Sequence, residues 1–354
     1  MTASVVPFSA VARLDLAVAL ADAQGQLAPS SRRMYRIDAE QFAAWMLERG
    51  LTPKTLTRSD VIAYRAYLQE TYRKATAERK LVVARRLLEE LVIGEVLAKS
   101  PAYKIKGFEL DDETPHVVLT EQEGQALLDV IAIGTLKGLR DYVVILLLLR
   151  TGIRRSEAAQ LAISDVSTDQ GHYVAVIQHG KGDRRRTVKL PVDVWREIDG
   201  YIQALKDYHA QRHEEQEAVL VPNLDEEIRR RELLHALEQQ HTMAASDPLF
   251  VSFRRGDHPT RRAMGDKAIE TQVKAYAARV PGLERLTPHG LRASFITLTL
   301  ENGAQLYQVQ YAAGHKHPKT TQRYHGRKTN LDDNAVDYLK LQRRSAAHVH
   351  QDGK

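Results

Sequence analysis

The chain has 354 residues, enough for about two domains of ordinary size, with 43% hydrophobic and 27% charged residues and a net charge of +6. This composition excludes a disordered chain, and the longest apolar run, residues 142–149, is too short for a transmembrane helix, which needs roughly 20 residues. The absence of cysteine excludes disulfides and thiolate metal sites and suits a reducing cytosol. The isoelectric point of about 9.3 favours a polyanionic partner.

Helical periodicity dominates the first third of the chain. Residues 1–29 lack a firm period and end in Ala-Pro, so we expect a flexible lead-in, and two charged residues among the first twenty argue against a secretory signal. From Ser31, a helix-capping residue, apolar side chains recur at about 3.6-residue spacing up to Gly50. Two more helices are expected before Pro101 ends the pattern. Residues 30–105 are therefore predicted to form a small all-helical domain.

This helical domain has a basic face. Residues 1–105 hold 16 Lys or Arg and 11 Asp or Glu, so most of the net charge lies in this region. Lysine and arginine side chains bind the phosphates of nucleic acid without reading its base sequence. The residues that we expect to contact DNA are Arg32, Arg33, Arg79, Lys80, Arg85 and Arg86.

A second domain is expected beyond a short linker. Residues 106–118 mix Gly, Pro and charges of both signs, which is typical of a linker, and residues 119–342 follow as one domain. An apolar helix around residues 139–150 is expected to lie in its core. Two alternating segments, residues 172–178 and 185–191, flank a Gly-Lys-Gly-Asp turn and predict an antiparallel β-hairpin.

The rest of the second domain is charged and mostly helical. Residues 206–246 form a charged insertion, and residues 343–354 are interpreted as a tail. The simplest interpretation of the insertion is a solvated helical extension, and the alternative is a docking surface for a neighbouring subunit, DNA or an accessory protein. The sequence contains no internal repeat, Gly-rich phosphate loop or paired-acid metal motif. The predicted fold class is mainly α with a small antiparallel β-sheet (α+β).

Four separated patterns carry candidate chemistry. In the first, TGIRRSE, Gly152 permits a tight turn that presents Arg154, whose guanidinium matches phosphate oxygens bidentately. In the second, Lys181 at the hairpin tip can reach into a groove or donate a proton to a leaving oxygen. Taken alone, the first pattern is more simply a helix end with a surface arginine, and the second an exposed lysine in a turn.

The other two patterns lie nearer the C-terminus. His289 and Arg292 are three residues apart, so on a helix they share a face and combine a phosphate clamp with a group that exchanges protons near neutral pH. His315 precedes Tyr324, and because a free tyrosine has a pKa near 10, only about one in a thousand is ionised at pH 7. Attack by Tyr324 therefore needs a base or cationic surroundings. Each pattern alone has an ordinary structural explanation, but together they form a set suited to metal-free cleavage of a phosphodiester.

In this order the motifs resemble those of the tyrosine recombinase (phage integrase) superfamily. The resemblance covers roughly residues 30–340. The helices of the first domain are similar to the helical core-binding domain of that superfamily, and TGIRRSE, GKGDRRRTVKLP, LTPHGLRASF and GHKHPKTTQRYH are similar to the motifs of its catalytic domain. Two positions depart from the pattern, since Ala293 stands where members often carry histidine and Ala313 where leucine is usual.

The resemblance implies a role for each candidate residue. Tyr324 would attack the scissile phosphate and become a 3′-phosphotyrosyl link. Arg154 and Arg292 would hold the non-bridging oxygens of that phosphate, and His315 would donate a further hydrogen bond to it.

Proton transfer is assigned to other residues by the same resemblance. Lys181 would act as general acid to the departing 5′ oxygen, and His289 would support proton transfer from the tyrosine. Glu157 would orient the first arginine, with an ordinary helix-capping role as an equal alternative. Because the bond energy is retained in the phosphotyrosine, neither a metal nor another cofactor is implied.

The implied function is site-specific recombination, in which duplex DNA is cut and rejoined for integration, excision or resolution of a mobile element or replicon. Exchange between two duplexes needs four active sites, so the resemblance implies a homo-tetramer assembled on double-stranded DNA. Accessory recombination proteins are further candidate partners, no membrane is expected to take part, and the expected location is the cytoplasm.

Three other functions fit parts of the sequence. A non-catalytic DNA-binding regulator could keep the same fold, but the complete catalytic set argues against it. A type IB-like topoisomerase shares the chemistry without strand exchange, and the basic helical domain favours recombination over it. A metal hydrolase using His289, His315 and His317 lacks a carboxylate partner at a suitable spacing.

Overall fold

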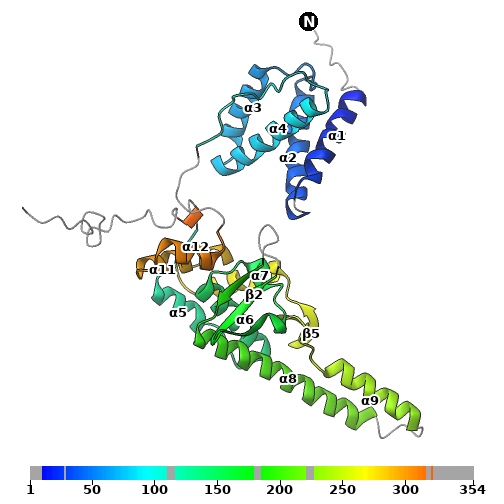
Figure 1. Ribbon diagram of the computed structural model, residues 1–354, viewed down its shortest axis with the longest axis vertical. Helices are drawn as coiled ribbons and strands as arrows, with labels where there is room; N and C mark the ends of the chain where they lie inside the picture. Colours follow the sequence, from blue (N-terminus) through cyan, green and yellow to red (C-terminus); the bar gives the residue numbers. More distant parts are fainter. Residues whose placement is uncertain are drawn as a thin grey trace, which may run out of the picture. The chain divides into compact units, whose positions relative to one another are not determined.

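The computed structural model describes residues 10–27, 29–109, 116–178, 185–220, 227–315 and 320–321. The chain divides between Asp112 and Glu113 into two compact units, here called unit 1 and unit 2. The division falls within residues 106–118, the segment expected to be a linker. Figure 1 shows unit 1 from blue to cyan and the helices and strands of unit 2 in the colours that follow.

Unit 1, in its described residues, is built from four helices: α1 (Ala10–Gly25), α2 (Pro29–Glu48), α3 (Arg58–Thr71) and α4 (Lys74–Ile93). Helix α4 contacts each of the other three and is the central helix of the unit. Aromatic rings join α2 to α3, since the Tyr64 ring centroid lies 4.7 Å from that of Phe42 and 5.0 Å from that of Trp45. Thr57 caps α3 by accepting a hydrogen bond from the backbone N–H of Asp60.

The expectation of a flexible lead-in over residues 1–29 is wrong for residues 10–25, because they form helix α1. Leu16, Ala19 and Ala23 recur at helical spacing, are buried, and face the rest of unit 1, where α1 contacts α2 and α4. Alanine buries little apolar surface, so a face built largely from it gives a weak hydrophobic pattern in the sequence. The close packing that small residues permit holds the helix in place.

The first part of the expected linker is bound to unit 1. The Arg65 guanidinium donates hydrogen bonds to the carbonyl oxygens of Lys106, at 3.0 Å, and Gly107, at 3.4 Å. It also lies over the Phe108 ring, at 4.3 Å from the centroid, and the Phe108 backbone N–H donates to a Glu78 carboxylate oxygen at 2.6 Å. Residues 106–108 are therefore anchored to unit 1, so this part of the expected linker is packed against a domain.

Unit 2 is mainly helical, as the sequence predicts, and it has two small antiparallel sheets where one was expected. Its described elements are α5 (Glu121–Asp129), α6 (Leu136–Thr151), α7 (Arg155–Ala158), the 3₁₀ helix η1 (Ile163–Asp165), β1 (Val166–Asp169), β2 (His172–Ile177), β3 (Arg186–Lys189), α8 (Val192–Leu220), α9 (Glu227–His241), β4 (Val251–Arg254), β5 (His258–Ala263), α10 (Asp266–Ala277), α11 (Pro288–Glu301) and α12 (Leu306–Ala313).

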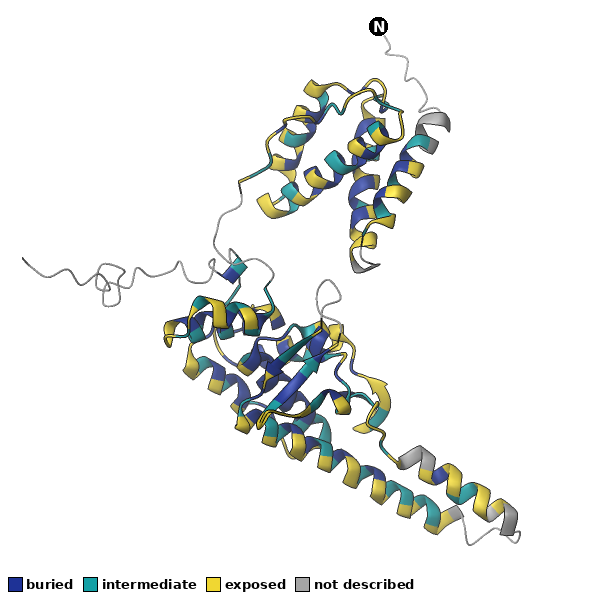
Figure 2. Ribbon diagram, in the orientation of Figure 1, coloured by how far each residue is buried: buried dark blue, intermediate teal, exposed yellow. Residues whose placement is uncertain are grey.

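The core of unit 2 is built around α6. Its apolar run Val143–Leu148 is buried because α5, α8, α10 and α11 all contact this helix. A helix that is apolar on all sides needs such cover, and Figure 2 shows the buried positions gathered inside the unit. Near the start of α6, the buried Arg140 donates to the carbonyl oxygen of Val251 at 2.8 Å and so joins α6 to β4. The predicted core helix is confirmed.

The predicted β-hairpin is confirmed in its two strands. Strands β2 and β3 pair antiparallel, with Val174 opposite Lys189 and Ile177 opposite Arg186, and β1 pairs with the other edge of β2. The tip that carries Lys181 lies outside the described residues. Strands β4 and β5 form a separate two-stranded sheet.

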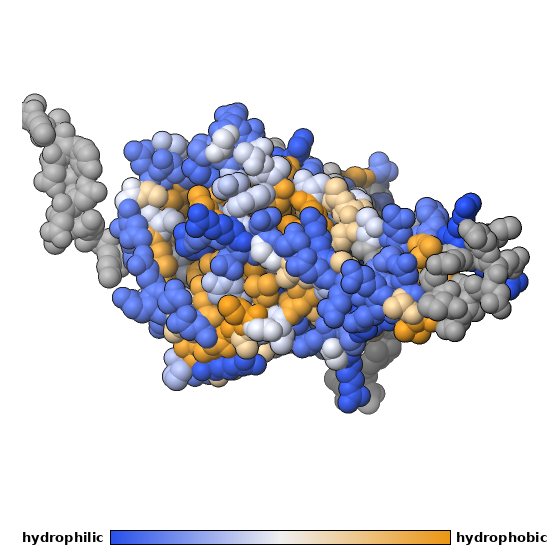
Figure 3. Space-filling model, turned by 90° about the horizontal axis from the view of Figure 1, so that it is seen from below, coloured by the Kyte–Doolittle hydropathy of each residue, from blue (hydrophilic) through white to orange (hydrophobic). Residues whose placement is uncertain are grey.

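In the residues that the structure describes, the helices of the charged insertion 206–246 are the distal part of α8 and the whole of α9. Helix α8 extends beyond the core and α9 returns beside it (Figure 1), with Leu237 buried at their contact. Figure 3 shows a face of the molecule on which hydrophobic groups lie among hydrophilic side chains, the ordinary character of a protein surface. In the part of the chain that the structure describes, no helix has the length and apolar character that a membrane span requires.

Candidate active site

A left-handed turn after α6 places the first predicted arginine. Gly152 has φ of 62°, and a Cβ atom on it would overlap the Phe295 ring, so both its backbone conformation and its neighbour require glycine. Arg154 follows as the N-cap of the short helix α7. Its side chain is one quarter exposed and is held by Glu157.

Glu157 is a buried carboxylate shared by two arginines. Its Oε1 accepts from Arg154 Nη1 at 2.8 Å, and its Oε2 accepts from the Arg154 backbone N–H at 2.8 Å. Arg186, at the start of β3, donates from Nη1 to Oε1 at 2.9 Å and from Nη2 to Oε2 at 2.6 Å. Burial alone would raise the pKa of Glu157, but the hydrogen bonds from Arg186 and Arg154 and the charge of Arg186 outweigh it and lower the pKa to about 2.

Arg292 lies on α11, whose first turn is capped by Thr287. Its guanidinium is buried and donates to the carbonyl oxygen of Gly152, in the turn after α6, and to that of Ala313 at 2.6 Å, at the end of α12. Arg154 Nη2 donates to the carbonyl oxygen of the next residue, Gly314, at 3.2 Å. The two predicted phosphate-binding arginines therefore meet at the same turn, although they are far apart in the sequence.

The two predicted histidines lie beside these arginines. His289 is in the first turn of α11, and its ring meets that of His116 edge to face with centroids 4.3 Å apart. Burial, followed by the effects of His116, Arg292 and Arg154, lowers the pKa of His289 to about 4. Burial and then the charges of Arg292 and Arg154 lower the pKa of His315 to about 3. Both imidazoles are therefore neutral at pH 7.

His315 is fixed at the end of the Gly314 turn. Its backbone N–H donates to the carbonyl oxygen of Gln310 at 3.0 Å. Its Nδ1 lies 2.8 Å from the hydroxyl of Thr321, which is fully buried. His315 is thus fixed at its backbone by Gln310 and at its ring by Thr321, next to the two arginines.

A pocket of about 480 Å³ opens over three of the predicted residues, Arg154, His289 and Arg292. The other residues that line it are Arg155, Ser156, Glu270, Thr287 and Pro288. Arg155 forms an ion pair with Glu270 on α10. The pocket therefore presents guanidinium groups and a neutral imidazole, which suits a phosphate group.

Two members of the predicted catalytic set, Lys181 and Tyr324, lie outside the described residues, as does His317. Tyr324 is three residues beyond Thr321.

The six basic residues predicted to contact DNA differ in their surroundings. Arg32 and Arg33 are exposed on α2. Lys80 is buried and donates to the Asp38 carboxylate at 2.9 Å, and Arg79 binds the same carboxylate. The prediction that Lys80 contacts DNA is wrong, because its charge is used inside the unit to join α4 to α2.

Arg85 and Arg86 also have partners within unit 1. Arg85 donates to the carbonyl oxygen of Ile105, and Arg86 lies 2.6 Å from the buried carboxylate of Glu90 and also donates to Gln26. These contacts give both arginines a structural role.

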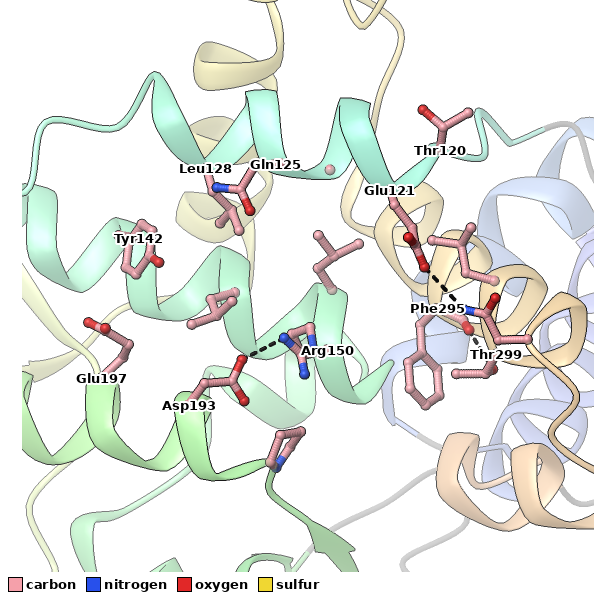
Figure 4. A pocket seen from close by; sticks show the side chains of 16 residues that line it. Thr120, Glu121, Gln125, Leu128, Tyr142, Arg150, Asp193, Glu197, Phe295 and Thr299 are labelled. Atoms are coloured by element: carbon pink, nitrogen blue, oxygen red, sulfur yellow. Dashed lines mark hydrogen bonds and ion pairs between the residues drawn. The ribbon is translucent and has the colours of Figure 1, made fainter.

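A second pocket, of about 570 Å³, lies between α5, α6, α8 and α11 (Figure 4). Leucine side chains and Phe295 line it, and its polar residues include Arg150, paired with Asp193 at 2.5 Å, and Glu121, which accepts from Asn302 at 3.1 Å. None of the predicted catalytic residues is among those that line it. Within the described ranges, no cluster of three or more His, Asp or Glu side chains could hold a metal ion.

Sequence reasoning missed Arg186 and His116. Arg186 is the third of three consecutive arginines, and nothing in that run distinguishes it from its neighbours. The predicted strand could have distinguished Arg186, because successive side chains of a strand point to opposite faces and Arg186 therefore faces away from Arg185. His116 gave no signal, since its contact with His289 joins residues 173 positions apart.

Comparison with known proteins identifies the same family as the resemblance of the sequence motifs. Residues 117–330 match the family model described as the phage integrase family. The tyrosine recombinase XerC of Myxococcus xanthus is 28% identical over 306 residues, which cover 86% of this chain and 89% of the relative. The tyrosine recombinase XerD of Proteus mirabilis is 29% identical over 301 residues, which cover 84% of this chain and 83% of the relative.

Solved structures share the fold. The Tn1549 transposon integrase in complex with transposon right end DNA gives a TM-score of 0.60 at 17% identity, covering 90% of this chain and 95% of that chain. A lambda integrase dimer bound to a COC′ core site gives a TM-score of 0.60 at 12% identity, covering 94% of this chain and 98% of that chain. Because the residues matched by the family model make up more than half of the sequence, the chain belongs to the phage integrase family.

Proposed function

We propose that this chain is a site-specific recombinase that cuts and rejoins double-stranded DNA through a phosphotyrosine formed on Tyr324. The observation that carries the proposal is the convergence of Arg154 and Arg292 on one turn, beside His289 and His315. Arg154, Arg292 and the neutral imidazole of His289 line one pocket, and the neutral imidazole of His315 lies beside the same arginines. This arrangement matches the needs of phosphoryl transfer, in which catalysis is mostly positioning and charge stabilisation.

The chemistry begins at the scissile phosphate. The Tyr324 oxygen attacks phosphorus, the bond from phosphorus to the 5′ oxygen breaks, and a 3′-phosphotyrosyl link forms. Arg154 and Arg292 stabilise the charge on the non-bridging oxygens, and His315, being neutral, donates one hydrogen bond to them. Rejoining is the reverse attack by a 5′ hydroxyl, so the phosphoester bond is conserved throughout.

Two protons move in this step. The phenolic proton leaves Tyr324 with the support of His289, whose low pKa keeps the ring able to accept a hydrogen bond at pH 7. Lys181 donates a proton to the departing 5′ oxygen. Lys181 precedes Arg186, the first residue of β3, by five positions in the sequence.

The partner is duplex DNA, and the working assembly is a homo-tetramer on it. Two duplexes exchanging strands present four scissile phosphates, and each chain supplies one nucleophile. The solved relatives with the same fold include an integrase in complex with transposon right end DNA and XerH bound to difH substrate. We place the enzyme in the cytoplasm, with integration, excision or resolution of a mobile element or replicon as its task and accessory recombination proteins as further partners.

The test is a covalent trapping experiment. DNA bound by the Tyr324→Phe variant is first selected from a random-sequence library, and a nicked suicide version of the selected site is then prepared. Wild type should form a covalent protein–DNA adduct, and Tyr324→Phe should bind the same DNA without forming one. An adduct with the Phe variant would refute the assignment of the nucleophile.

Two further measurements separate the alternative functions. The adduct should form equally well in EDTA, whereas loss of cleavage on chelation would favour a metal hydrolase. Plasmids with two target sites should yield recombinant products, whereas relaxation of a plasmid without recombinants would favour a topoisomerase.

A further inference from the structure

The buried Glu157 creates an electrostatic problem at the phosphate site. Glu157 accepts one hydrogen bond from the Arg154 guanidinium and one from the Arg154 backbone N–H. A carboxylate paired with a guanidinium also neutralises it, and a neutralised arginine stabilises a phosphate poorly. Arg186 lies on the other side of the same carboxylate. We propose that Arg186 is a positioning residue of the active site, which compensates Glu157 so that Arg154 keeps its charge for the scissile phosphate. This inference rests on the proposed function.

The hydrogen bonds around Glu157 support a shared carboxylate. Each of its oxygens accepts one hydrogen bond from Arg154 and one from Arg186, at 2.6 to 2.9 Å. These four bonds match the acceptor capacity of a carboxylate. The three ionised groups together carry a charge of +1, and it is Arg154 that lines the pocket. Arg186, with 14% of its side chain exposed, is less accessible than Arg154, with 25%.

Arg186 also supports the turn that precedes His315. A Cβ atom on Gly314 would lie 2.7 Å from Arg186 Nε and 2.9 Å from its Cζ, so the guanidinium lies directly against the Gly314 backbone. The carbonyl oxygen of Gly314 accepts from Arg154 at 3.2 Å. Arg186 itself is fixed by the strand pairing that places it opposite Ile177. One side chain therefore contacts both the carboxylate that holds Arg154 and the turn that leads to His315.

The ionisation of Glu157 makes compensation necessary across the working pH range. Its pKa of about 2 means that the carboxylate stays charged at any pH at which the enzyme acts. Without Arg186, the pair Arg154–Glu157 would have no net charge. Overall DNA affinity should change little, because it depends on many phosphate contacts, whereas stabilisation of the transition state should fall.

The experiment measures single-turnover cleavage of the nicked suicide DNA by three variants: Arg186→Gln, Arg186→Lys and the double variant Glu157→Gln/Arg186→Gln. We expect Arg186→Gln to cleave about 10- to 100-fold more slowly than wild type, the range for loss of a hydrogen-bonded charge. Arg186→Lys should lose less, because it keeps the charge. The double variant should be faster than Arg186→Gln, because removing both charges restores +1 at the site.

A second substrate tests whether the effect passes through Arg154. When a methylphosphonate replaces the scissile phosphate, one non-bridging oxygen and its negative charge are absent, so Arg154 has less charge to stabilise. The defect of Arg186→Gln should therefore shrink several-fold on this substrate. A merely structural defect would slow both substrates equally.

Controls separate this inference from folding and from the proposed function. Arg150→Gln removes another arginine that pairs with a carboxylate, and it should cleave at the wild-type rate. Thermal melting and DNA binding of each variant report folding. A folded Arg186→Gln that cleaves like wild type, a folded Arg186→Lys as slow as the Gln variant, or a double variant no faster than the single one would each overturn the inference. If wild type itself forms no covalent adduct, the proposed function fails instead.

Discussion

Each unit contains a buried carboxylate bound by two cationic side chains, but the two clusters do different work. In unit 1, Asp38 binds Arg79 and Lys80, and in unit 2, Glu157 binds Arg154 and Arg186. In the first cluster the partners join two helices, and the lysine is buried with the carboxylate. In the second, one arginine lines an open pocket. Exposure alone does not separate the two clusters, because the Arg79 side chain is 41% exposed and that of Arg154 is 25% exposed. What differs is that Arg154 lines a pocket together with His289 and Arg292, as the proposed function requires.

The largest expected effect comes from removing the charge of Arg154, the arginine of the unit 2 cluster that lines the pocket. Arg154→Gln should slow cleavage of the suicide substrate by about 10³-fold, because an arginine that stabilises a transferring phosphoryl group is worth at least that much. Thermal stability and DNA binding should stay close to those of wild type. The measurement is single-turnover cleavage with saturating enzyme, and a rate within tenfold of wild type would show that Arg154 does not contact the reacting phosphate.

A smaller effect, on stability alone, is expected for the carboxylate of unit 1. Asp38→Ala leaves Lys80 buried without its carboxylate partner, so the free energy of unfolding of unit 1 should fall by about 3 kcal/mol. The sequence has two tryptophans, Trp45 in unit 1 and Trp195 in unit 2. Urea unfolding followed by fluorescence in a Trp195→Phe background therefore reports unit 1 alone.

The control for this variant is Asp193→Ala, measured in a Trp45→Phe background that reports unit 2. It breaks a half-exposed ion pair with Arg150 and should lower the free energy of unfolding by less than about 1 kcal/mol. Both variants should cleave bound DNA at the wild-type rate. If Asp38→Ala is as stable as wild type, the cluster in unit 1 is not the structural element described here.

The smallest expected effect is a loss of stability of unit 2 as the pH falls. The pKa values of His289 and His315 lie near 4 and 3 in the folded chain, below the ordinary value of about 6.5. The unfolded chain therefore binds more protons below pH 6.5, and stability is lost as the pH falls from about 6.5 towards these values. Glu157, with a pKa near 2, loses its contribution only below about pH 4.5.

Between pH 7 and pH 4.5 we therefore expect unit 2 to lose about 2 kcal/mol, after allowance for the remaining solvent exposure of both rings. Urea unfolding in a Trp45→Phe background measures this change. The double variant His289→Gln/His315→Gln should show a flatter dependence in the same pH window, and an unchanged slope would exclude these imidazoles as its cause.

The parts of the molecule that the sequence predicts are those encoded by local patterns. The apolar run in α6 predicts a buried helix, the turn at Gly152 follows from a glycine directly after that run, and the spacing of His289 and Arg292 places both on one helix. The superfamily resemblance is likewise confirmed, because it depends on the order of short motifs.

The missed features depend on residues far apart in the chain. Lys80 is buried because Asp38, on another helix, meets it, and a basic run alone does not distinguish a buried lysine from an exposed one. Arg186 depends on a carboxylate 29 positions earlier. Helix α1 was missed for a different reason, since its packed face relies on alanine, which carries little hydrophobic signal.

The carbonyl oxygens of Ala313 and Gly314 accept hydrogen bonds from the same two arginines that are proposed to bind the phosphate. In the proposed function, the two arginines that bind the phosphate therefore also anchor the turn from which the chain continues to Tyr324. The number of residues between Gly314 and Tyr324 would then set how far the proposed nucleophile can reach from that turn. Inserting one residue after His315 should therefore misalign the proposed attack by Tyr324 while every residue proposed to bind the phosphate is kept.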